Sequence, residues 1–185
     1  MAKGYRDASL RNIVRSVGMT TGAFYGYYKG KEELFGALVG EHYAFLLARF
    51  QQAQQEFAAL PHAQQPEALH DISGLCMFDM LHYAYAHLEE CKLILCCSEG
   101  TRFSNLIDEM VRIEEEGTHA YLQVLEKLGR PSLHIDPTLE HILITGMFHT
   151  FFELVIHQMP LQDAEAYVAE MRAFYTAGWM KIMGQ

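Results

Sequence analysis

The sequence predicts an all-α protein, with a short helix-turn-helix module followed by a bundle of longer helices. Nearly every segment spaces its apolar residues with the 3.6-residue period of a helix, and few runs alternate as strands do. Half of the 185 residues are hydrophobic and 12% are aromatic, which suits a packed core and not a disordered chain. A concentration of basic residues at the N-terminus separates the module, residues 1–39, from the bundle, residues 40–185.

The first two predicted helices are short and lie close together in the sequence. Ser9 is a suitable N-cap for the first, and Gly18 supplies the turn that follows it. Thr20 or Thr21 caps the second helix, and Gly30 ends it. Two short helices joined by a glycine-containing turn form a helix-turn-helix, whose second helix lies in the major groove of DNA.

The remaining helices are longer and are separated by proline and glycine signals. The stops are LPHAQQP at residues 60–66, GRP at 129–131, and Pro160. The expected helices cover approximately residues 31–57, 67–88, 92–97, 101–128, 137–158 and 161–183.

Charge divides the chain in the same place as the helices do. Residues 1–31 hold six basic residues and one acidic residue, whereas the remainder holds eight basic and 22 acidic residues. An acidic body repels a polyanion, so contact with nucleic acid is plausible only through the N-terminal module.

The second short helix has residue types suited to DNA contact. Hydroxyls and free N–H groups at its start can bind phosphate, small residues allow a close approach to the groove, and tyrosine and lysine side chains can reach the backbone. Phe24 is expected in the core of the module, and Tyr28 is the tyrosine best placed to pack beside it. The candidate DNA-binding residues are Ser9, Thr20, Thr21, Gly22, Ala23, Tyr25, Tyr27, Tyr28, Lys29 and Lys31.

The stretch SLRNIVRSVGMTTGAFYGYYKGKEELFGALV resembles the helix-turn-helix and the start of the fourth helix of the tetracycline-repressor (TetR) family. The resemblance covers about residues 3–39 without a gap. It implies a dimeric, ligand-responsive repressor, with residues 20–23 near base edges of a palindromic operator. It also implies phosphate contacts from Ser9, Tyr25, Tyr28 or its neighbour Tyr27, and Lys31. A cytoplasmic location is expected separately, because secreted disulfide scaffolds are much denser in cysteine than this chain.

The chain departs from the family pattern in two places. The family usually has a histidine or another polar residue where Gly26 and Tyr27 stand. The family also has a further helix before the segment AKGY, so residues 1–5 resemble only its last turn. Most of the first helix is therefore expected to be missing from the given sequence. A misassigned start or a numbering that begins part-way along the protein is favoured over a truncated module, because Leu10, Ile13, Val14 and Phe24 would otherwise lose much of their cover.

Three of the longer helices have apolar stripes interrupted by polar groups, as a small-molecule site in a bundle requires. Plain core packing predicts the same stripes. A metal site on the set His149, Glu153 and His157 is not expected, because eight residues of helix span about 12 Å. The candidate effector-pocket residues are Phe78, Asp79, His82, Tyr85, Phe103, Ile107, Met110, Glu114, Tyr121, Thr145, Phe148, His149 and Phe152.

The last two helices hold more apolar surface than an exterior pair needs, which predicts burial against a second copy in a four-helix interface. The candidate interface residues are Phe151, Leu154, Val155, Tyr167, Met171, Phe174 and Tyr175.

Other classes of function find little support. The four cysteines form no C-x-x-C pair, no catalytic or nucleotide-binding motif is present, and no apolar run approaches the roughly 20 residues that span a bilayer. No cofactor or metal is therefore expected, nor a membrane partner. The sequence predicts a non-enzymatic DNA-binding regulator released from its operator by a small molecule. The alternatives are a helical sensory protein that no longer binds DNA, and a metal- or cofactor-dependent helical enzyme.

Overall fold

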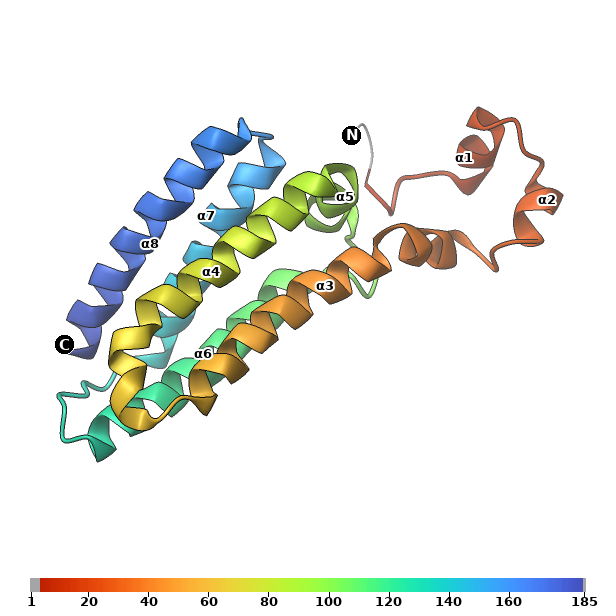
Figure 1. Ribbon diagram of the computed structural model, residues 1–185. Coiled ribbons are helices and arrows are strands. Elements are labelled where there is room, and N and C mark those ends of the chain that lie inside the picture. The colour runs from red at the N-terminus through yellow and green to blue at the C-terminus, as the bar shows by residue number, and fades with distance from the viewer. Residues whose placement is uncertain (1–3, 185) are drawn as a thin grey trace.

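The computed structural model describes residues 4–184, apart from the side chains of His70 and Ser73, and is helical with no strand in that range. Helices α3 to α8 form an elongated bundle, and α1, α2 and the first turns of α3 project from one end of it (Figure 1). The predicted all-α class is confirmed.

The helix bounds follow the predicted ones closely, with three differences. The second short helix ends at Tyr25, where Gly26 is its C-cap. The fifth helix begins earlier than predicted, directly after His87, which ends one helix and caps the next. Residues 101–105 form turns held by the Thr101 hydroxyl, which donates to the carbonyl of Ser98 at 2.7 Å. The elements are α1 (Leu10–Ser16), α2 (Thr21–Tyr25), α3 (Lys31–Ala59), a 3₁₀ turn (His62–Gln64), α4 (Gln65–Ala86), α5 (Leu88–Cys97), α6 (Leu106–Lys127), α7 (Pro137–Ile156) and α8 (Leu161–Met183).

Helix α3 belongs to both parts of the molecule. Its 29 residues begin beside α2 and continue along the bundle, where they pack against α4, α5 and α6. A helix of this length rises about 1.5 Å per residue without a break. A displacement of its bundle half is therefore transmitted to its first turns.

The core of the bundle is built from aliphatic and aromatic residues of all six long helices. Phe50 of α3 meets Phe148 of α7 edge to face, with ring centroids 5.2 Å apart. The largest fully buried apolar side chains are Phe151, Phe152, Leu46, Met80, Leu81, Met110, Leu125, Ile144, Val39, Val155 and Val168.

The segment before α1 is tied to the junction of the module and the bundle. The Tyr5 N–H donates to the carbonyl of Cys97 at 2.8 Å, and its ring meets Phe35 at 5.3 Å. The Lys31 ammonium lies 4.2 Å from the centre of that ring and donates to the carbonyls of Tyr5 and Ala8. These contacts fix the orientation in which the module leaves the bundle.

Among the described residues, α7 is the one helix long and apolar enough to cross a membrane by length and composition. This differs from the expectation that no apolar run approaches that length. In the most apolar stretch of α7, 39% of the residues are buried, and the helix packs against α4, α5, α6 and α8. A core helix of a bundle can have the same length and composition, and the packing of α7 against four other helices is that of a core helix.

Candidate nucleic-acid interface and ligand cavity

The turn between α1 and α2 is formed as the sequence predicts. Gly18 has a φ of 71°, a conformation that favours glycine. Thr20 is the N-cap of α2, and its hydroxyl oxygen accepts a hydrogen bond from the Ala23 N–H at 3.1 Å. Val14 of α1 and Phe24 of α2 are each 3% exposed and form the small core of the module.

Burial of Phe24 leaves the opposite side of α2 facing outward. Thr21, Gly22 and Ala23 are all exposed. A Cβ at Gly22 would meet nothing closer than the Thr20 hydroxyl at 4.0 Å, so this face is open to a partner.

The three tyrosines divide between surface and core. Tyr25 is 56% exposed and Tyr27 is 76% exposed. Tyr28 is half-buried, and its ring lies 5.6 Å from that of Phe24, as predicted for the packing tyrosine. Tyr25 and Tyr27 are therefore the two that are free to reach a phosphate.

Two of the predicted phosphate contacts have different surroundings from those expected. Ser9 is at the N-cap position of α1, but its hydroxyl makes no capping bond and it is exposed. Lys31 is half-buried and its ammonium is used for the carbonyls at the junction. Lys31 therefore has a structural role in this conformation, because its charge faces the protein.

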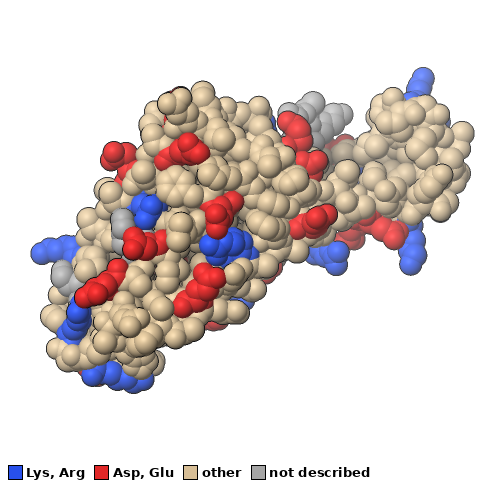
Figure 2. Space-filling view, viewed as in Figure 1, with Lys and Arg blue, Asp and Glu red and all other residues tan. Residues whose placement is uncertain are grey.

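The basic character of the module is concentrated on fewer residues than the composition suggests. Arg6 pairs with Glu99 of the bundle, with Nη1 and Oε1 2.6 Å apart. Arg11, Arg15 and Lys29 are exposed. Figure 2 shows isolated basic groups on the outer part of the module and most of the acidic groups on the bundle.

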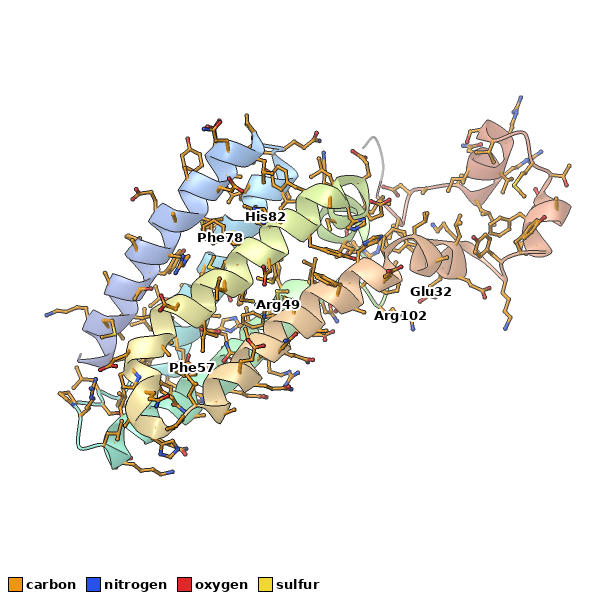
Figure 3. All side chains as sticks on the ribbon, in the orientation of Figure 1. Glu32, Arg49, Phe57, Phe78, His82 and Arg102 are labelled. Carbon is orange, nitrogen blue, oxygen red and sulfur yellow. The ribbon has the colours of Figure 1, made fainter. Side chains whose placement is uncertain are left out.

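A cavity of about 130 Å³ lies inside the bundle, in the half distant from the module. Phe57, near the end of α3, is one of its walls, and Figure 3 shows it far along that helix from Glu32 in the first turn. The lining residues are Ala53, Gln54, Phe57, Leu69, Ile72, Met77, Glu114, Gly117, Thr118, Tyr121, Met147, Arg172, Tyr175, Thr176, Trp179 and Met183.

Glu114 is the acidic group of this cavity. Burial raises the pKa of Glu114 to about 7, and the carboxylate of Glu140 adds to that rise, while a hydrogen bond from Gln54 opposes it. The Gln54 amide donates to Glu114 Oε2 at 2.6 Å. A Cβ at Gly117 would lie 2.3 Å from the Gln54 side-chain oxygen, so the absence of a side chain at Gly117 gives this amide its place.

Of the predicted effector-pocket residues, only Glu114 and Tyr121 line the cavity. Tyr121 is 3% exposed and its hydroxyl has no hydrogen-bond partner among the described residues. The core takes up Phe103, Met110, Phe148 and Phe152, which are buried against their neighbours. Phe78, Ile107 and Thr145 are half-buried and do not line the cavity.

The predicted polar pocket residues have partners elsewhere. Asp79 pairs with Arg49 at 2.8 Å, and His82 with Glu165 at 2.6 Å. The Tyr85 hydroxyl donates to two backbone carbonyls, at Leu154 and Met159. His149 is exposed. These side chains share a helix face as the sequence predicts, but that face meets other helices and solvent and does not line the cavity.

The predicted pocket set contains no residue of α8, because that helix was assigned wholly to a dimer interface. Arg172, Tyr175 and Trp179 of α8 close the cavity, and Arg172 lies 5.7 Å from the centre of the Phe78 ring. A Cβ at Gly74 would lie 1.9 Å from the Arg172 guanidinium, so this glycine makes room for it. The sequence signal for this close approach is Gly74 itself, a glycine in the interior of a predicted helix.

The candidate interface residues fall into two groups. Phe151, Leu154 and Val155 are buried within the protomer, so a second copy is not needed to cover them. Tyr167 and Phe174 are 49% and 73% exposed. Met171 is half-buried against the core of the bundle, and Tyr175 lines the cavity.

The four cysteines form no disulfide, and of these only Cys96 is exposed. Burial raises the pKa of Cys76 and of Cys91 to about 12 and also raises that of Cys96. The thiolate is the reactive form, so none of these three has the low pKa of a redox-sensing cysteine.

The outward-facing short helix on a small core defines the N-terminal part as a helix-turn-helix DNA-binding module. Residues 1–38 match the family described as bacterial regulatory proteins, tetR family. The match identifies the N-terminal module as a DNA-binding module of the tetR-family type, and so favours DNA binding over the sensory alternative. Comparison with curated proteins gave no match, and comparison with solved structures gave none either.

Proposed function

We propose that the protein is a homodimeric repressor that a small molecule releases from its operator. The observation that carries this proposal is a ligand-sized cavity against the far half of α3, the helix whose first turns belong to the DNA-binding module. A ligand seated there contacts a continuous helix that extends into that module.

The cavity favours a small aromatic effector with one polar group. Phe57, Met77 and Trp179 supply apolar walls. A volume near 130 Å³ is comparable to that of an apolar cavity of about 150 Å³ that admits benzene. Glu114 and the Tyr121 hydroxyl offer hydrogen bonds to the polar group of such a molecule.

The proposed mechanism is a shift between two conformations. The effector favours a state in which α3 tilts and the separation of the two α2 helices in the dimer changes. Tenfold weaker operator binding requires a preference of about 1.4 kcal/mol, and nearly complete release requires a few kcal/mol.

The exposed apolar side chains of α7 and α8 support dimerisation through this face. A twofold axis there would place two α2 helices about one DNA turn, or 34 Å, apart and match a palindromic operator. The large exposed apolar residues of these two helices are Leu139, Ile142, Leu161, Tyr167 and Phe174.

The proposal is tested with a panel of single-ring aromatic compounds, with and without an amine or hydroxyl, in a thermal-shift assay followed by release of labelled DNA. The proposal expects at least one compound to raise the Tm of the wild-type protein and release the DNA. Glu114→Gln is expected to weaken both effects, whereas Glu126→Gln, at an exposed position of the same helix, leaves them unchanged. Compounds that release DNA equally from both variants would contradict the assignment of the cavity.

A further inference from the structure

A second cluster of polar side chains lies between the cavity and the module, where α3 meets the corner of α4 and α5. His42 comes from α3, His87 lies at the corner itself, and Glu90 is in the first turn of α5. One ligand atom of each residue lies within 4.8 Å of the others, and all three side chains are half-buried. In the part of the chain that the structure describes, this is the only group of three or more His, Cys, Asp and Glu residues so arranged.

The two imidazoles are held by aromatic neighbours. The His42 and His87 ring centroids are 4.6 Å apart, and the Tyr83 ring lies 4.5 Å from that of His87. His42 Nδ1 lies 3.0 Å from the Tyr83 hydroxyl oxygen, and Phe45 stacks on Tyr83 at 3.6 Å. The Tyr83 hydroxyl thus engages Nδ1 of His42, and Nε2 is left to bind an ion. Metal-binding histidines commonly have such a hydrogen-bond partner on the nitrogen that does not bind the metal.

We propose that His42, His87 and Glu90 bind one divalent ion of the zinc class, and that the ion fastens α3 to the corner of α4 and α5. Two imidazole nitrogens and one carboxylate form a ligand set that zinc uses with an open fourth position for water. The partial exposure of all three side chains leaves room for that water.

The distances are compatible with this assignment. Zinc bonds of about 2.0–2.2 Å place the ligand atoms of a tetrahedral site about 3.3–3.6 Å apart. The ligand atoms, which all lie within 4.8 Å of one another, therefore need to converge by up to about 1.5 Å, which χ rotations of the three side chains can supply. One ligand comes from α3 and the other two come from the corner of α4 and α5, so the ion links these two segments.

Aromatic packing alone explains only part of the arrangement. Tilted ring contacts account for the placement of His42, Tyr83 and His87, but they give no reason for a half-buried carboxylate beside both imidazoles. A cation between them satisfies the carboxylate and the two nitrogens together. The site is distinct from the effector cavity, and its test needs neither DNA nor an effector.

The experiment is a zinc titration of the untagged full chain by calorimetry, with bound zinc counted by elemental analysis after dialysis. The expected result is one ion per protomer and a Tm that rises with zinc. Cobalt substitution is expected to give the visible absorption bands of a tetrahedral site.

The variants separate this site from incidental histidine binding. His87→Gln and Glu90→Gln are each expected to lower zinc affinity at least tenfold and to abolish the cobalt bands. The control is His141→Gln, because His141 pairs with Glu115 at 3.0 Å on the exposed surface and belongs to no such cluster. Circular dichroism establishes that each variant is folded. An absence of stoichiometric zinc, or the same affinity in the Glu90 and His141 variants, would overturn the proposal.

Discussion

The cavity carboxyl makes a prediction about how stability depends on pH. Burial raises the pKa of Glu114 from its ordinary value near 4.5 to about 7 in the folded protein. Between these two values the folded carboxyl holds a proton that the unfolded carboxyl has lost. The free energy of unfolding therefore falls as pH rises through this window and levels off above about pH 7.

The size of the effect follows from the two pKa values. The loss of stability through this one group is about 0.8 kcal/mol at pH 5 and about 3.3 kcal/mol at pH 8, at 1.36 kcal/mol for each tenfold change in proton affinity. Glu114→Gln removes the titration and retains an oxygen that can accept the Gln54 hydrogen bond. The free energy of unfolding of the variant, measured relative to that of the wild type, is therefore expected to be about 2.5 kcal/mol higher at pH 8 than at pH 5.

The assay is urea unfolding of both proteins at pH 5 and pH 8, at one protein concentration so that dimerisation contributes equally. Other groups titrate in both proteins, so their contributions to the free energy of unfolding cancel when the two proteins are compared. A difference that changes by less than about 0.5 kcal/mol between the two pH values would refute the reasoning, because it would mean that the folded carboxyl has an ordinary pKa.

Three further predictions concern the junction, the thiols and the dimer face. Lys31→Met is expected to lower the free energy of unfolding by about 2 kcal/mol through loss of its bonds to backbone carbonyls, measured by urea unfolding against Lys29→Met, whose side chain is exposed. A thiol reagent is expected to modify Cys96 rapidly and the buried cysteines only on unfolding; rapid reaction of all four would contradict the placement of the thiols. Phe174→Glu is expected to convert the proposed dimer to a monomer, measured by light scattering, and an unchanged mass would contradict the placement of α8 in the proposed interface.

Much of the fold was predictable because it depends on local signals. Gly18 and Thr20 specify the turn of the module, and proline and glycine mark the ends of the long helices. The length of α2 was overestimated because Gly26 was not recognised as the residue that ends it.

The cavity and the histidine cluster depend on long-range packing, which periodicity does not report. Gln54 and Arg172 reach the cavity from helices separated by more than 100 residues. His42 and His87 are likewise distant in sequence and meet only because α3 packs on the corner of α4 and α5. A helical stripe indicates which side chains share a face, but it does not indicate which helix that face meets.

The central claim is that the exposed face of α2 reads DNA. The measurement that tests it most directly is a fluorescence-anisotropy titration against DNA from immediately upstream of the protein's own gene, at two salt concentrations, with Ala23→Glu as the test variant. Ala48→Glu makes the same change at an exposed position of α3 outside the module and serves as the control. Binding by the wild type and by the Ala48 variant is expected to exceed that to a scrambled sequence and to weaken with salt, and only the Ala23 variant is expected to lose it. Equal binding by the two variants, or no preference over the scrambled sequence, would contradict the central claim.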